Sequence, residues 1–116
     1  MLGLEEPTDP VELLALEVRR VSDRLRSLSL SRLGAPLPPY ASRADAGHAL
    51  AQLLADAGAD LDGRPRRVVP RLGDESVGDQ VAVTGRDLVV AARAGTAADE
   101  AVAAALADLR SLRLAL

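Results

Sequence analysis

The sequence predicts an all-α protein, built as a four-helix antiparallel bundle. Leucine, alanine and arginine dominate the composition, and leucine and alanine are strong helix formers. Apolar residues recur every three or four residues in several separate segments, which is the spacing of one helix face. The chain has 116 residues, of which 48% are hydrophobic. This length predicts a single helical domain, 1–116. With no Phe, Trp or Ile, its core must consist of Leu and Val with Ala between them.

The first helix has the clearest start. Asp9 is in place to be the N-cap, Pro10 suits the first helical position, and Glu12 completes a capping box. From Val11 to Leu28 the apolar residues alternate spacings of three and four, which is a heptad seam. We expect a helix over residues 10–31. Three further leucines widen the seam into a broad stripe that must be buried against something: Leu13, Leu16 and Leu30.

A proline-rich connector over residues 34–40 ends this helix. Ser42 then predicts the N-cap of a second helix, with Asp45 in its first turn. Either Gly58 or Gly63 is expected to end it. Glycines and prolines mark residues 61–73 as a loop.

Residues 74–94 have two interpretations. As a helix, Val77, Val81 and Leu88 share a face. As strands, residues 80–92 form a hairpin that would make the fold α+β, but a lone hairpin is marginally stable. Gly78 and Gly85 disfavour a helix. They are seven residues apart on one face, however, and close packing there would offset the cost. The helix is therefore the favoured interpretation.

The last helix is expected to begin with Thr96 as its cap and Asp99 in its first turn. Its apolar stripe runs from Val102 to Leu116. Gly95 leaves only a short corner before it. The third and fourth elements are therefore expected to be antiparallel neighbours.

The composition indicates origin and compartment. The chain has no Lys, Ile, Phe, Asn, Cys or Trp, and all 14 positive charges are arginine. Most of these gaps fall on residues with AT-rich codons, which points to a GC-rich bacterial genome. The N-terminal residues lack a basic and apolar leader, and no apolar run approaches the ~18 residues of a membrane span. We expect a cytoplasmic protein with no membrane partner.

The motifs of common enzyme classes are missing from the sequence. Without cysteine there is no disulfide, thiolate zinc site or thiol nucleophile. There is also no glycine-rich phosphate loop, nucleophile elbow or metal-ligand spacing. His48 is the only histidine, and no nucleophile stands beside it. The prediction is a non-enzymatic protein with no catalytic residue, no cofactor and no metal.

One charge cluster suggests a binding role. Its members could hold a phosphate group or the acidic face of a partner: Arg64, Arg66, Arg67 and Arg71. The net charge of −3 and the pI of about 5.1 argue against nucleic acid, as does the lack of aromatic residues for base stacking. A regulatory module that binds nucleic acid or a phosphorylated ligand through this loop is therefore the alternative hypothesis.

The excess of leucine supports the first hypothesis, which is protein–protein association as a homodimer or an adaptor. A core of this size should not need every leucine in the first and last helices, and the remainder would form an interaction patch. A two-fold interface is the simplest way to cover it. The candidate interface residues are Leu13, Leu16, Leu30, Leu112, Leu114 and Leu116.

Overall fold

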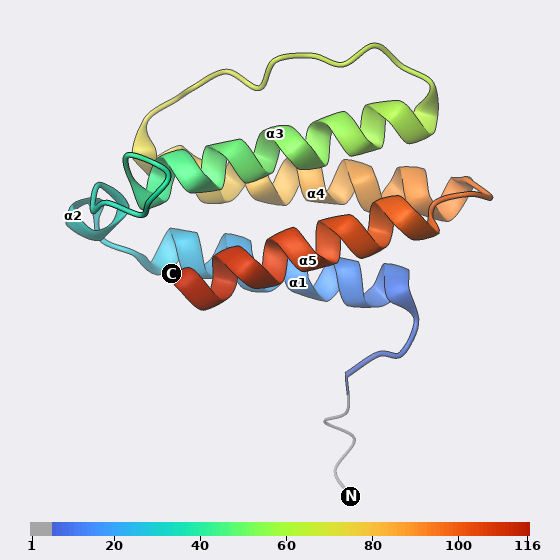
Figure 1. The fold of residues 1–116 in the computed structure, drawn as a ribbon, viewed down its shortest axis with the longest axis horizontal. Coiled ribbons are helices and arrows are strands. Elements are labelled where there is room, and N and C mark those ends of the chain that lie inside the picture. The colour runs from blue at the N-terminus through green and yellow to red at the C-terminus, as the bar shows by residue number, and fades with distance from the viewer. Residues whose placement is uncertain (1–5) are drawn as a thin grey trace, which may run out of the picture.

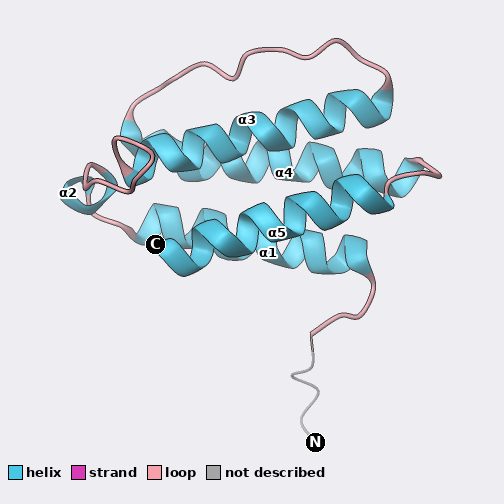
Figure 2. Cartoon of the chain, viewed as in Figure 1, coloured by secondary structure: helices cyan, strands magenta, loops and turns pink. Residues whose placement is uncertain are grey.

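The computed structural model describes residues 6–116, and within that range it contains helices and no strand (Figures 1 and 2). The all-α prediction is confirmed. The elements are α1 (Pro10–Ser27), α2 (Leu30–Leu33), α3 (Arg43–Asp62), the short 3-10 turn η1 (Asp74–Ser76), α4 (Val77–Ala94) and α5 (Asp99–Ala115).

Four long helices form a bundle in which α4 packs between α3 and α1, and α5 packs on α1 (Figure 1). Helices α3 and α4 run parallel. A Cβ added at Gly47 would lie 2.8 Å from Val77, and one at Gly58 would lie 3.5 Å from Leu88. An extended segment over residues 63–73 makes this possible, because it carries the chain back along the outside of α3 (Figure 1). We call this segment the strap.

The strap also decides which helices are neighbours. It places α4 beside both α3 and α1, and the corner at residues 95–98 then brings α5 to the other side of α1. The prediction that the last two elements are antiparallel neighbours is only half right. Helices α4 and α5 run in opposite directions, but they lie diagonally across the bundle and do not form a packed pair. The all-antiparallel arrangement expected from the sequence is therefore wrong for two pairs: α1 and α5 run parallel, as do α3 and α4.

The predicted N-caps of α1 and α3 are confirmed. The Asp9 carboxylate accepts a hydrogen bond from the Glu12 amide at 3.2 Å, and the Ser42 hydroxyl accepts one from the Asp45 amide at 3.0 Å. Helix α3 ends at Gly63, whose φ of 65° is a left-handed conformation that favours glycine.

The expected helix over residues 10–31 is wrong at its end. Helix α1 stops at Ser27, Leu28 is extended, and the Ser29 hydroxyl caps α2 by accepting from the Arg32 amide at 3.2 Å. The break turns the chain so that both Leu28 and Leu33 are buried in the core.

The hairpin alternative for residues 80–92 is wrong, because these residues lie in α4. Gly78 and Gly85 face α1. A Cβ at Gly85 would lie 2.5 Å from Val18, and one at Gly78 would lie 2.9 Å from the Ser22 carbonyl oxygen. The two glycines therefore let α1 and α4 approach closely, and the packing offsets their low helix propensity.

The predicted start of the last helix is also wrong. Helix α5 begins at Asp99, preceded by Ala98, and no side chain caps it. Ala98 is buried in the core. Because this burial holds residues 95–98 in a non-helical corner, α5 begins too late for Thr96 to cap it.

The core draws on all four long helices. Its largest fully buried side chains include Leu14, Leu25, Leu54, Leu88 and Leu109. As the composition predicts, Leu and Val fill it, with Ala between them.

Candidate binding surfaces

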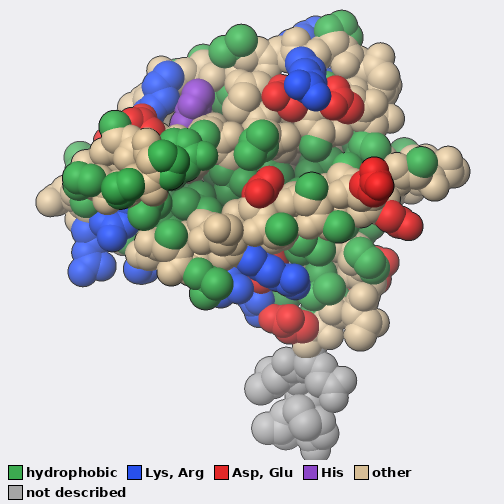
Figure 3. All heavy atoms as spheres, viewed as in Figure 1, with side chains coloured by type: hydrophobic (Ala, Val, Ile, Leu, Met, Phe, Trp, Pro, Cys, Tyr) green, Lys and Arg blue, Asp and Glu red, His purple; other side chains and the backbone are tan. Residues whose placement is uncertain are grey.

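Helices α3 and α5 leave an open groove between them. Two hollows, of about 240 and 230 Å³, lie in line along it and share Leu53 and Asp108. Hydrophobic side chains gather in this groove on the face shown in Figure 3. We call it the α3–α5 groove.

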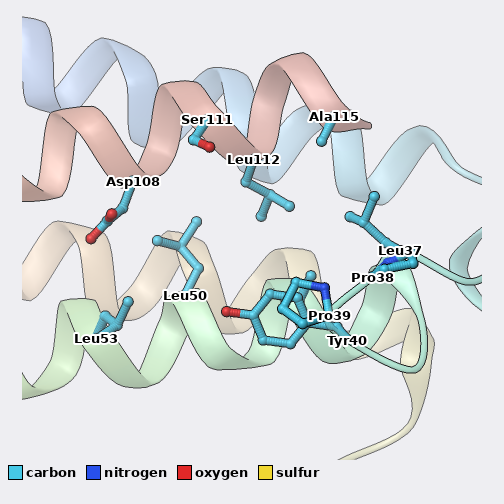
Figure 4. A pocket seen from close by; sticks show the side chains of 11 residues that line it. Leu37, Pro38, Pro39, Tyr40, Leu50, Leu53, Asp108, Ser111, Leu112 and Ala115 are labelled. Atoms are coloured by element: carbon cyan, nitrogen blue, oxygen red, sulfur yellow. The ribbon is translucent and has the colours of Figure 1, made fainter.

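Small and apolar residues line the α3–α5 groove. Leu50, Leu54 and Ala105 are buried beneath it, whereas the Leu53 side chain is 51% exposed. The connector closes one end with Leu37 to Tyr40, where the Tyr40 amide donates to the Leu37 carbonyl at 2.8 Å. Figure 4 shows this turn beside Leu50 of α3 and Leu112 of α5.

The other end of the α3–α5 groove is acidic. Asp56, Asp60 and Asp108 line it together with Arg66. Arg66 donates to both Asp60 oxygens, at 3.0 and 2.7 Å, and this pairing lowers the pKa of Asp60. Three carboxylates against one guanidinium leave two negative charges on this rim.

The structure does not bring the four predicted arginines of the loop into one site. They are spread along the strap, which runs the length of α3 (Figure 1). Arg64 pairs with Asp62 at 3.0 Å, and Arg71 pairs with Asp45 at 3.0 Å and Asp74 at 2.7 Å. Of the four, only Arg67 has no carboxylate within 4.0 Å among the residues described. The loop's positive charge is thus largely neutralised within the chain.

His48 and Gln52 of α3 hold the strap in place. The Gln52 side chain accepts from the Val69 amide at 2.8 Å and donates to the Arg67 carbonyl at 3.0 Å. His48 Nε2 lies 2.8 Å from the Val69 carbonyl oxygen. Both residues act as clamps for an extended segment that has no partner strand.

The six candidate interface leucines do not form one patch. Leu13, Leu112 and Leu116 pack against the core, and Leu16 is half-buried. Leu30 and Leu114 are 64% and 80% exposed, but they lie on separate helices. Only Leu112 lines the α3–α5 groove.

A second group of arginines comes together only in the folded chain. These side chains line a hollow of about 330 Å³ between α1 and α4: Arg19, Arg26, Arg86 and Arg93. They are dispersed in the sequence, so no local charge cluster marks them. The only sequence signal is that each helix carries two arginines seven residues apart.

The described residues provide neither a cluster of metal ligands nor a membrane-spanning helix. Within residues 6–116 no three His, Asp or Glu side chains are placed to hold a metal ion. No helix in the same range has the length and apolarity needed to cross a bilayer. Comparison of the chain with protein-family models, curated proteins and solved structures gave no match.

Proposed function

We propose that this chain is a non-enzymatic helical protein that mediates protein–protein association, acting as a homodimer joined through the α3–α5 groove. The proposal includes a bacterial cytoplasmic setting. The depletion of residues with AT-rich codons, which is typical of a GC-rich genome, supports the bacterial part of it.

The main support for this proposal is the open side of the bundle, between α3 and α5. The three other neighbouring helix pairs pack closely, whereas α3 and α5 meet only loosely. Leu53 is half exposed in the middle of the resulting groove, with Leu50 and Leu112 beside it. Apolar surface of this kind, rimmed by charged residues, is typical of an interaction site.

A second copy fits this groove for steric and electrostatic reasons. Ala57, Ala101 and Ala104 line its acidic half, so another helix could approach closely. A two-fold axis across the groove would run the paired helices antiparallel. The acidic end of one copy would then face the proline-rich end of the other, and like charges would be kept apart. Each Leu53 would enter the hollow of its partner.

The alternative role, binding of nucleic acid or a phosphorylated ligand through the strap arginines, has less support. Arg64, Arg66 and Arg71 already pair with carboxylates of α3 or η1. A phosphate would have to displace those partners before it could bind.

Light scattering or sedimentation at micromolar concentration tests the proposal. The wild-type chain should have twice the monomer mass. Leu53→Glu should have the mass of a monomer, because the substitution would bury a charge in the interface. Val90→Glu is the matched control. Val90 is 60% exposed on α4, away from the α3–α5 groove, so this variant should stay dimeric. A wild-type chain that remains monomeric would refute the homodimer.

A further inference from the structure

The hollow between α1 and α4 has a distinct construction. Its floor is mainly apolar and made of small side chains, and its edges carry the four arginines. The floor residues are Ala15, Val18, Ser22, Ala82 and Val89. Helices α1 and α4 lie behind α3 and α5 in Figure 1, so this hollow is on the opposite side of the bundle from the α3–α5 groove. We call it the arginine groove.

Most of the charge in the arginine groove is uncompensated. Arg26 pairs with Asp79 at 2.7 Å and with Asp23 at 3.4 Å. By contrast, no carboxylate of residues 6–116 lies within 4.0 Å of the guanidinium of Arg19, Arg86 or Arg93. Three positive charges therefore border one apolar hollow in a chain whose net charge is −3.

The arginines are arranged in two rows. Arg19 and Arg26 are seven residues apart on α1, as are Arg86 and Arg93 on α4, and seven residues span about 10.5 Å of helix. Gly78 and Gly85 draw the two helices together, so the rows flank a narrow apolar strip. A helix with an apolar seam and carboxylates repeated every heptad on its flanks has the complementary pattern.

Nucleic acid fits this groove less well. No aromatic side chain lines it, so bases would have nothing to stack on. An apolar floor also contributes little to contacts with a phosphate backbone, and the negative net charge would repel a long polyanion.

We propose that the arginine groove docks an acidic amphipathic helix of another protein. Together with a homodimer formed on the opposite face, this second surface would make the chain an adaptor that presents two identical docking sites. The inference uses different residues from the α3–α5 groove, so either can fail alone.

A designed peptide tests the docking site. It would have about three heptads, which is longer than the ~12–15 residues below which an isolated helix is marginal, with leucine along the seam and glutamate at the flanking positions. Its binding would be followed by fluorescence anisotropy at micromolar protein. A peptide with glutamine in place of glutamate measures the contribution of charge, and a random DNA duplex measures general polyanion binding.

Two triple variants with the same change of net charge separate the groove from the overall charge. Changing Arg19, Arg86 and Arg93 to Gln should weaken binding of the glutamate peptide by about tenfold. Changing three exposed arginines elsewhere to Gln should change it little: Arg32, Arg64 and Arg67. Binding should also persist in Leu53→Glu, because that residue lies on the other face.

Several results would overturn the proposal. The glutamate peptide could fail to bind the wild-type chain, bind no better than the glutamine peptide, or lose affinity equally in both triple variants. Tighter binding of the DNA duplex than of the peptide would assign the arginine groove to nucleic acid instead.

Discussion

Arg113 of α5 holds the buried carboxylate of Glu17 of α1 with two hydrogen bonds, Nε to Oε2 at 2.8 Å and a terminal nitrogen to Oε1 at 3.2 Å. The Glu17 side chain is only 2% exposed, and Arg20 donates to the same carboxylate at 3.0 Å. The hydrogen bonds compensate a charge that burial alone would make costly. They also tie α1 to α5.

Removing the Arg113–Glu17 ion pair should destabilise the fold. Arg113→Ala should lower the free energy of unfolding by about 1–3 kcal/mol, because a buried charge loses two hydrogen bonds while Arg20 still partly compensates it. Arg93→Ala is the matched control, since Arg93 has no carboxylate partner in the described part of the chain. Its effect should stay within about 0.5 kcal/mol. Urea denaturation measures both, and equal losses would contradict a clamp role for Arg113.

The same carboxylate should make stability depend on pH. Burial alone would raise the pKa of Glu17, but the hydrogen bonds and charges of Arg113 and Arg20 outweigh it and hold that pKa below its ordinary value. The folded state therefore binds fewer protons than the unfolded state at this residue. Its contribution is fully present above the unfolded pKa of about 4.3 and is lost as the pH falls through the folded pKa.

Comparison with Glu17→Gln isolates this effect from the other carboxylates. The wild-type chain should be the more stable of the two at neutral pH, and the difference should shrink as the pH falls below about 4. Urea midpoints measured across that range give the difference directly. A gap that stays constant down to low pH would mean that the pKa of Glu17 is not lowered.

Two glycine substitutions should have opposite effects. Gly85→Ala should destabilise the fold, because its Cβ would lie 2.5 to 3.1 Å from three atoms of Val18 and would force α1 away from α4. In Gly58→Ala the nearest atoms are at 3.5 Å, an ordinary contact. That variant should be neutral or stabilising by up to ~1 kcal/mol, through helix propensity. Melting temperatures compare them, and an unchanged value for Gly85→Ala would refute the close α1–α4 packing.

Two leucines of the expected first helix, Leu25 and Leu30, should differ greatly in their contribution to stability. Leu25→Ala should cost about 2–5 kcal/mol, because Leu25 is 1% exposed and its removal leaves a cavity in the core. Leu30→Ala should cost far less, because Leu30 is largely exposed. Denaturant midpoints for the two variants decide this. Similar costs would mean that Leu30 is buried in an assembly, as the excess of leucine suggested.

The local features of the helices could be predicted from the sequence. A cap such as Asp9 or Ser42 acts within its own first turn, and the left-handed residue Gly63 ends its own helix. The heptad seam of α1 likewise depends only on spacing along the chain. These signals identified the all-α class because each depends on residues within a turn or two of one another.

The path of the chain between helices depended on contacts that a local pattern does not contain. The break at Leu28 brings two leucines into the core, and burial of Ala98 shifts the start of α5. The strap is held along α3 by Gln52 and His48, two α3 residues that contact the backbone of Val69 although they are distant from it in sequence.

The candidate sites also depended on the tertiary structure. The arginines of the strap are close in sequence, yet their charge is taken up by carboxylates of α3 and η1. Arg19 and Arg86 are 67 positions apart (86 minus 19), and they line one groove only because Gly85 lets α4 pack against Val18. The sequence by itself determined the helical class and the caps of α1 and α3, since these depend on neighbours along the chain. The packing of those helices decided which charges meet, because distances between helices are set by side-chain volume and not by sequence separation.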